Sequence, residues 1–457
     1  MPGIVAAIFS IFGIAVGFSL YFSIPFAIIL FVFIIFLRIK NPLYFIIFVL
    51  SFFSSLFYFK QENSGFGKIR GTVLRTFGKG YIVVDGFKRV FTYIDLNEEI
   101  ETGDVVEIEG EVCKPKKYIY VSNGINLIMH NSKVLNIEER NNLLSIINSI
   151  RKKIYLNMID LLGYEDGNVV AGLTIGRVIK TSSYIEHKFK RAGLIHLLAV
   201  SGLHIGALLL FSLLILKIMG MNKDNFILKL IIIVIPVLIY SAIAGFRHSV
   251  IRASITGIML GMGFISGKYV NFWNSLGHAL WINLIIYPWA ILSPGFQLSY
   301  LAVISIFITI SFLPAIKNNY LRWIIYPVVV STAIQLFLIP LLLIYFKGYS
   351  PVSPITNLLC SFFISLLVPV SLLLSFVSLI YKPVLIVLYP FVRALNLITS
   401  ISYYITIPYV KLSSLIAILL ISSFPFIVGL LKKKLLFVFI LLFSYLFIVI
   451  ITFFDLL

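Results

Sequence analysis

The chain has 457 residues, of which 60% are hydrophobic and 12% are charged, and its mean hydropathy is +1.04. Soluble domains carry about 25% charged residues, so this composition excludes a monomeric water-soluble protein. The net charge of +19 invites a nucleic-acid interpretation. However, ten of the 15 basic residues after position 192 are explained by the cytoplasmic loops of a membrane protein.

Residues 1–59 predict three membrane spans. They contain only two charged residues, Arg38 and Lys40, among long apolar runs. A run of about 20 apolar residues is the length that crosses the hydrocarbon core. The start lacks a basic n-region and an A-x-A-like cleavage site, and a further apolar run follows at Leu43–Phe59. We therefore expect retained spans and no cleaved leader.

Residues 60–137 differ sharply, with 11 basic and 10 acidic side chains. Short alternating runs separated by turn residues such as Asn123-Gly124 predict about five β-strands. Such a set in about 70 residues favours a small closed barrel of the OB type, with a β sandwich as the alternative. The expected strands are Lys68–Leu74, Tyr81–Phe87, Arg89–Ile94 and Val105–Val112, closed by Tyr118–Val121 and Ile125–Met129.

Residues 138–191 form the next predicted segment, and within it residues 138–163 predict an amphipathic helix. An apolar stripe with helical spacing runs from Leu143 to Leu161, and the basic residues 151–153 lie between its members. A basic face beside an apolar stripe is typical of a helix on the membrane surface. A helix packed on the β domain is an equally good interpretation.

The lysines and arginines between the apolar runs predict the topology, because cytoplasmic loops carry an excess of both. Placing Arg38 and Lys40 inside sends the β domain outside, and the later basic loops then alternate correctly. We expect an inner (plasma) membrane protein with about 13 helical spans, in a range of about 11–14, with the N-terminus inside. Residues 352–380 fit either one long span or a broken pair.

Residues 192–457 would form the main membrane domain, and they are poor in acids. They contain 15 basic residues and two acidic ones, Asp224 and Asp455. Coupled carriers usually hold Asp or Glu within the membrane, and cation channels use acidic rings. The scarcity of acidic residues therefore disfavours a coupled carrier and a cation channel, and it fits a path for an anionic substrate. Five basic residues lie where the topology does not ask for them: Arg247, Arg252, Lys347, Arg393 and Lys411.

The run Ala192–Gly206 places His196, Ser201 and His204 around a Ser-Gly break at the outer end of a span. Non-helical backbone at membrane depth persists only where it is buried in protein or lines water. A helix-packing motif with two satisfied histidines is the plainer alternative. A Ser201–His204 nucleophile is a third, but no nearby Asp or Glu would orient the base.

Three further blocks carry polar residues in apolar surroundings. Arg247, His248 and Arg252 lie in Ala244–Ala253, and Gln297 lies in Ser293–Tyr300 after a Pro-Gly turn. The last block runs from Gln335 through Pro340 and Ser353-Pro354 to Asn357. Buried amides in spans more often join helices than bind ligands.

Together these blocks resemble the ComEC family of competence proteins, the inner-membrane DNA-uptake channels of bacteria. The resemblance rests on the string from Gly193 to Gly206, supported by the other three blocks in the same order and spacing. It covers residues 160–370, and the OB-like domain extends it to about residue 66.

The resemblance implies passage of single-stranded DNA into the cytoplasm during natural transformation, with no enzymatic activity, cofactor or metal. The partners that it implies are the lipid bilayer, a surface or periplasmic DNA receptor and a cytoplasmic DNA-translocating motor, the last two supplied by other proteins. It is also compatible with a homo-oligomer. The residues that it places on the DNA path are His196, Ser201, His204, Arg247, Arg252, Gln297, Gln335 and Asn357.

The chain departs from many family members in one respect. These carry a C-terminal metallo-β-lactamase-like domain, whereas this sequence ends at Leu457 and has no H-x-H-x-D-H motif. It resembles the short forms, which we expect to conduct DNA without cutting it. The near-neutral charge of residues 60–137 argues against strong DNA affinity of the β domain alone. A transporter of another anionic or lipid-linked substrate and an intramembrane Ser/His enzyme stay open as alternatives.

Overall fold

The computed structural model describes residues 65–77, 80–86, 88–93, 100–115, 118–138, 142–176, 183–197, 202–219, 225–406, 418–426 and 441–445, with isolated residues at 6, 10, 11, 50, 51, 438, 440, 447 and 448. The chain packs as two compact units, each built from two stretches of sequence. Unit 1 comprises Met1–Lys152 and Leu208–Ser293, and unit 2 comprises Lys153–Ala207 and Pro294–Leu457. The predicted boundaries at residues 59, 137 and 191 stay predictions.

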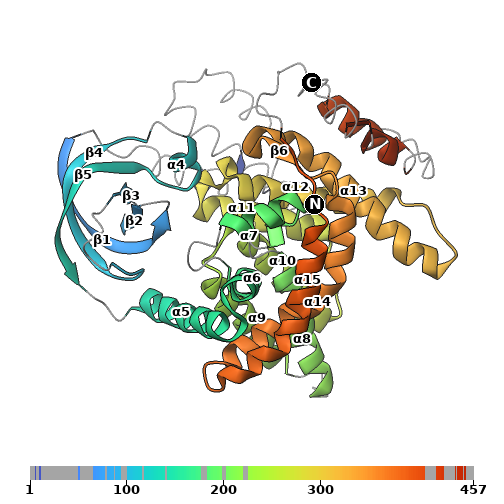
Figure 1. Cartoon of the computed structure of the whole chain (residues 1–457), viewed down its shortest axis with the longest axis horizontal. Coiled ribbons are helices and arrows are strands. Elements are labelled where there is room, and N and C mark those ends of the chain that lie inside the picture. Colours follow the sequence, from blue (N-terminus) through green and yellow to red (C-terminus); the bar gives the residue numbers. More distant parts are fainter. Residues whose placement is uncertain are drawn as a thin grey trace. The chain divides into compact units, whose positions relative to one another are not determined.

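A closed five-stranded barrel forms the β part of unit 1, as the sequence predicts (Figure 1). The strands are β1 (Gly65–Phe77), β2 (Gly80–Asp85), β3 (Lys88–Thr92), β4 (Val105–Cys113) and β5 (Leu127–Glu138). They pair in the order β1-β2-β3-β5-β4 and close between β4 and β1. The β3–β5 pair is parallel and all the other pairs are antiparallel.

The barrel interior is filled by alternate strand residues, among them Val73, Val90 and Ile108, which are fully buried. A second apolar layer lies on the outer face of β2 and β3, where Ile82 and Phe91 pack with Ile125. These strands are therefore buried on both faces, which explains why their sequences read as nearly continuous apolar runs.

Helix α4 (Tyr118–Ser122) covers this outer layer, and the prediction of a strand at Tyr118–Val121 is wrong. A four-residue apolar run cannot be assigned from its period alone. The backbone N–H of Ile125 bonds the carbonyl of Tyr120 at 3.0 Å, which closes the segment into a helical turn. The tyrosine then packs its ring against Phe91, 5.1 Å between centroids.

Helix α5 (Leu143–Leu162) confirms the predicted helix, and its first part contacts the barrel. Asn142 donates a side-chain hydrogen bond to the carbonyl of Gly103 at 2.7 Å, and Lys152 pairs with Glu101 at 2.5 Å. The second half, from Lys153 onward, belongs to unit 2, where Met158 is fully buried. These contacts favour the packed helix over one lying free on a membrane surface.

The other helices described in unit 1 are apolar. Helix α8 (Gly202–Ile218) begins in unit 2 and continues into unit 1, and the others follow it in sequence. They are α9 (Phe226–Ile243), α10 (His248–Ser266), α11 (Phe272–Ile286) and the 3-10 helix η2 (Pro288–Leu292).

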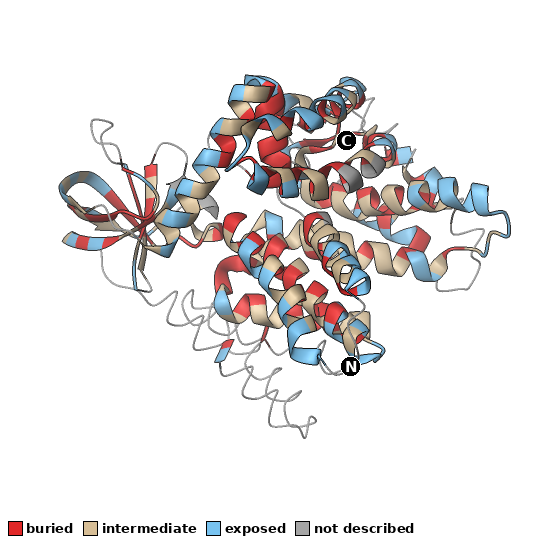
Figure 2. Cartoon of the chain, turned by 90° about the horizontal axis from the view of Figure 1, so that it is seen from below, coloured by how far each residue is buried: buried red, intermediate tan, exposed pale blue. Residues whose placement is uncertain are grey.

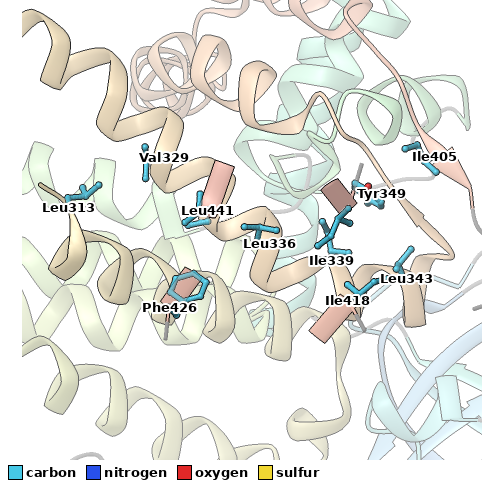
Figure 3. Close-up of a cluster of buried hydrophobic side chains, with 12 residues drawn as sticks. Leu313, Val329, Leu336, Ile339, Leu343, Tyr349, Ile405, Ile418, Phe426 and Leu441 are labelled. Atoms are coloured by element: carbon cyan, nitrogen blue, oxygen red, sulfur yellow. The ribbon is translucent and has the colours of Figure 1, made fainter. Parts of the chain in front are cut away.

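Unit 2 is built around the long helix α13. Its side chains Leu336, Ile339 and Leu343 pack against residues from the C-terminal part of the chain, including Ile418 and Phe426 (Figure 3). The elements of the unit are α6 (Tyr164–Thr174), α7 (Ser183–Arg191), η1 (Ile195–Leu197), α12 (Pro294–Phe312), α13 (Asn319–Phe346), β6 (Gly348–Tyr349), α14 (Ser353–Val377), η3 (Lys382–Leu388), α15 (Tyr389–Ser400) and β7 (Ile405–Thr406).

Five helical stretches among the described residues are long and apolar enough to cross a membrane. Exposed residues are spread along many of the helices of the chain (Figure 2). On α9, for example, the large apolar side chains of Ile227 and Leu238 are exposed. Such exposure suits contact with lipid. The stretches are Phe226–Ile243, His248–Ser266, Pro294–Phe312, Asn319–Phe346 and Lys382–Ser400. A multi-pass membrane protein is therefore supported, whereas the count of 13 is not tested, since the three N-terminal spans fall outside the described residues.

Candidate functional site

Unit 2 has a helix break at Gly193, within the predicted run Ala192–Gly206. The predicted break at Ser201-Gly202 stays a prediction. Helix α7 ends at Arg191, a turn follows with Gly193 at a φ of 73°, and η1 precedes the start of α8 at Gly202. Ser201 lies outside the described residues, so the Ser201–His204 hypothesis stays a prediction.

Two hydroxyl groups from the α13–α14 turn hold the end of α7. The last carbonyls of a helix have no partner within it. Here Ser350 donates to the carbonyl of Arg191 at 2.8 Å, and Thr356 donates to the carbonyl of Ala192 at 2.6 Å. Both hydroxyl residues are buried. Sequence reasoning missed them, because serine and threonine are common in spans and only their partners distinguish these two.

The same turn presses directly on the helix break. A Cβ placed on Gly193 would lie 2.5 Å from the Cβ of Ser353, and no such contact is tolerated. Asn357 donates to the Ser353 hydroxyl at 3.0 Å, which fixes that side chain against the glycine. The first and fourth sequence blocks, 150 residues apart, therefore meet at one place.

The two glutamines take different positions. Gln335 is buried on α13 and donates a hydrogen bond to the backbone carbonyl of Ser350 at 3.3 Å. This bond holds the backbone of the α13–α14 turn. Gln297, on the first turn of α12, accepts a hydrogen bond from Tyr345 at 2.8 Å. This bond joins α12 to the end of α13, which is the helix-joining role expected for amides in spans.

The two histidines also differ. His196 in η1 has an exposed side chain. His204 is fully buried in α8, where its Nε2 hydrogen-bonds the carbonyl of Leu173 at the end of α6. His204 thus fits the satisfied-histidine alternative, whereas His196 stays accessible beside the break.

In unit 1 a sharp turn between α9 and α10 positions Arg247. Gly245 and Phe246 both adopt positive φ, 78° and 46°, and Arg247 then takes the N-cap position of α10. Its side chain is half-buried, whereas Arg252 is only 8% exposed. Both arginines were predicted as DNA-path residues, and the burial of Arg252 favours Arg247 as the residue that contacts DNA.

A chain of side-chain contacts links this turn to the barrel. His248 exchanges two hydrogen bonds with Asn283, both 3.2 Å, and its ring packs edge-on against Tyr287. Tyr287 packs in turn on Trp289 of η2, whose ring lies 4.8 Å from the Arg89 guanidinium of β3.

Three further arginines approach Arg247 in unit 1. The pKa of Arg75 is lowered to about 10, mainly because the surrounding protein removes water from its guanidinium group. The positive charges of Arg89 and Arg247 lower this pKa further. Burial and the charge of Arg247 likewise lower the pKa of Arg151 to about 10. Sequence reasoning missed this grouping because its members are far apart in the sequence and come from the barrel, α5 and the turn before α10.

Unit 2 also contains a buried acid that sequence reasoning did not weigh. Asp166, in the first turn of α6, accepts a hydrogen bond from Asn396 at 2.7 Å and lies 3.6 Å from Arg393. It precedes residue 192, so the count of acids after that position omitted it. The acid content of this unit is therefore higher than the sequence argument assumed.

The chemistry of these sites is that of binding and positioning. Hydroxyl, amide and guanidinium groups dominate both, and they donate hydrogen bonds to oxygen atoms. Within the ranges that the structure describes, no group of three His, Cys, Asp or Glu residues could hold a metal ion.

Comparison with known proteins gives a family. The family model for "Competence protein" matches residues 173–453. The ComE operon protein 3 of Bacillus subtilis (strain 168) is 26% identical over 243 residues, which cover 52% of this chain and 30% of that protein. The chain thus aligns with less than a third of this relative's length. No solved structure matches significantly. Because the family match covers more than half of its residues, the chain belongs to the competence protein family.

Proposed function

We propose that this chain is a channel that passes single-stranded DNA across the inner membrane during natural transformation. The observation that carries the proposal is the meeting of the helix break at Gly193 with the α13–α14 turn at Ser350–Thr356. Irregular backbone at membrane depth persists only inside protein or beside water. The first and fourth of the sequence blocks meet at this irregular segment.

The path residues that were predicted from the sequence have distinct roles in this proposal. His196 and Asn357 flank the break and would contact the strand, while His204 and Gln335 hold the backbone around it. Gln297 keeps α12 and α13 together. Transport would therefore depend on shape and hydrogen bonding, with no covalent chemistry by the chain.

The finer features of the proposal follow the sequence argument. The barrel is of the OB type and lies outside the cytoplasm, and the membrane part has about 13 spans. A DNA receptor on the outside and a DNA-translocating motor in the cytoplasm are supplied by other proteins. Ser201 remains a path residue in this proposal.

The test follows labelled DNA in a deletion strain. We expect normal DNA binding at the cell surface and normal arrival in the periplasm, together with loss of arrival in the cytosol. Restoring the gene should restore cytosolic arrival. Unchanged cytosolic arrival in the deletion strain would refute the proposal.

A coupled transporter of another anionic substrate is the second candidate, and the buried Asp166 favours it, since such carriers keep carboxylates among their helices. The two candidates differ in one measurement. A carrier predicts saturable uptake of a small anion that Asp166→Asn abolishes, whereas the DNA channel predicts no such uptake.

A further inference from the structure

A cleft opens at the C-terminal end of α10, within unit 1. Its volume is about 440 Å³, which falls in the range of small-ligand sites, about 300–1,000 Å³. The end of α10, the loop after it and the first turns of α11 form its walls. The described residues that line it include Lys268, Asn271, Asn274 and His278, and no Asp or Glu. The cleft therefore suits a ligand that carries negative charge.

The loop between the two helices has a fixed shape. Gly267 ends α10 in the left-handed region, with a φ of 61°. A Cβ on Gly263 would collide with the side chain of Val270, so the loop packs directly on the helix. Asn271 then caps α11, because its Oδ1 atom accepts from the backbone N–H of Asn274 at 3.2 Å. The cleft is thus set by the backbone of the folded unit.

Two side chains of the cleft can hydrogen-bond a ligand. The Trp281 indole donates to the Nδ1 atom of His278 at 2.9 Å, so this nitrogen is unprotonated and the Nε2 atom carries the hydrogen. Asn274 lies one turn earlier on the same face of α11. Its buried Oδ1 atom has no hydrogen-bond partner among the described residues. A buried amide oxygen without a donor is unfavourable, and a ligand hydroxyl would satisfy it.

The cleft also lies where a membrane span meets the lipid headgroups. Helix α10 is one of the five stretches that are long and apolar enough to cross a membrane. The side chains of Met262 and Phe264, near its end, are 39% and 69% exposed, and Tyr269 is 91% exposed. Tyrosine at the end of a span is typical of the membrane–water interface, and lysine there reaches toward the headgroups. The acyl chains of a bound lipid would therefore run along α10.

The groups in the cleft define the chemistry of the ligand. A cation and an N–H donor match a phosphate, and an unsatisfied acceptor matches a hydroxyl group on it. We propose that the cleft between α10 and α11 binds the phosphoglycerol headgroup of an anionic phospholipid, phosphatidylglycerol. Lys268 and the Nε2–H of His278 hold the phosphate, and Asn274 accepts from a headgroup hydroxyl. This site is independent of the proposed function, because its groups would bind the lipid whatever the chain transports.

The test uses native mass spectrometry of the full chain in a non-ionic detergent and measures the dissociation constant of the first bound lipid. Phosphatidylmethanol is the matched lipid, because it has the same charge and no headgroup hydroxyl. The parent should bind phosphatidylglycerol about fivefold more tightly, which is the contribution of one hydrogen bond. Lys268→Gln should weaken the binding of both lipids about fivefold. Lys217→Gln, at the end of α8 and outside the cleft, should change neither affinity.

Asn274→Leu separates a ligand site from a structural role. It should abolish the preference for phosphatidylglycerol, while phosphatidylmethanol binding stays unchanged. The Tm should stay the same or rise, because the variant removes an unsatisfied buried oxygen.

Three results would overturn the inference. The first is a preference for phosphatidylglycerol that persists in Asn274→Leu, and the second is an unchanged phosphatidylglycerol affinity in Lys268→Gln. The third is displacement of the lipid by an equal concentration of glycerol phosphate, which would assign the cleft to a soluble ligand. None of these results affects the deletion-strain test of the channel, so the two proposals fail separately.

Discussion

Replacing Gly193 with alanine tests the contact between the helix break and the α13–α14 turn. The residue has a φ of 73°, and its missing Cβ would lie 2.5 Å from that of Ser353. An alanine in the left-handed region costs about 1–2 kcal/mol. Forcing a methyl group into the close contact with Ser353 costs about 1–3 kcal/mol more. We therefore expect a loss of about 2–5 kcal/mol of stability.

Two other glycines separate these contributions. Gly245 has a φ of 78° but open space around its Cβ position, so Gly245→Ala should show only the conformational cost. Gly206 lies in the regular part of α8, also with nothing nearby. Gly206→Ala should be neutral or stabilising by about 1 kcal/mol, because alanine is the better helix former.

The assay follows thermal unfolding through Cys360, which is 1% exposed in the folded chain. A thiol-reactive dye labels it on unfolding, and a Cys113→Ser background removes the more accessible thiol. Gly193→Ala should lower the Tm by an amount on the order of 10 °C for a unit of this size. A Tm within about 1 °C of the parent, or a loss no greater than that of Gly245→Ala, would refute the packing argument.

The remaining predictions concern the turn, the topology and the two arginines. Thr356→Val should lower the free energy of unfolding by about 1–3 kcal/mol, because it leaves a buried carbonyl unsatisfied. Thr332→Val should lower it less, because the Thr332 hydroxyl bonds within its own helix. The same dye assay measures both losses. A cysteine at the exposed Lys133 should react with an impermeant reagent in intact spheroplasts, and labelling only after lysis would contradict an outward barrel. Arg247→Gln should reduce cytosolic arrival of DNA at normal expression. Compared with Arg247→Gln, Arg252→Gln should reduce DNA transport less and lower the Tm more, because the Arg252 side chain is buried. A larger loss of transport in Arg252→Gln would indicate that Arg252 contacts the DNA instead.

The barrel could be predicted because its signal is local. Alternation and turn dipeptides specify strands over a few residues, and five short strands in about 70 residues favour a closed barrel. The prediction failed at Tyr118–Val121, where four apolar residues suit a strand or a helix equally. In the structure Tyr120 of this helix packs against Phe91, and that contact cannot be read from the local sequence.

The sites were only partly predictable, because their partners are distant in sequence. The run that contains the break at Gly193 stood out for its small residues, although the sequence placed the break at Ser201-Gly202. The hydroxyls that satisfy it, Ser350 and Thr356, lie more than 150 positions away and resemble many others. The grouping of Arg75, Arg89, Arg151 and Arg247 could not be seen in a count of net charge, because the acids of residues 60–137 nearly balance the bases there. Glu107 and Glu138, for example, pair with Lys68 and Arg70.

The buried Asp166 bears on the argument for an anionic path. Its carboxylate would oppose a passing polyanion if it faced the path alone. It is instead held by the Asn396 amide at 2.7 Å and lies 3.6 Å from Arg393, a basic residue that the topology did not require. A second acid of the same region, Asp160, pairs with Lys382 at 2.7 Å. Each of these acids in unit 2 is thus matched by a cation from η3 or α15, so their presence adds little net negative charge. The excess of basic over acidic residues that was inferred from residues 192–457 therefore also describes folded unit 2. That unit nevertheless contains more acids than the sequence argument counted.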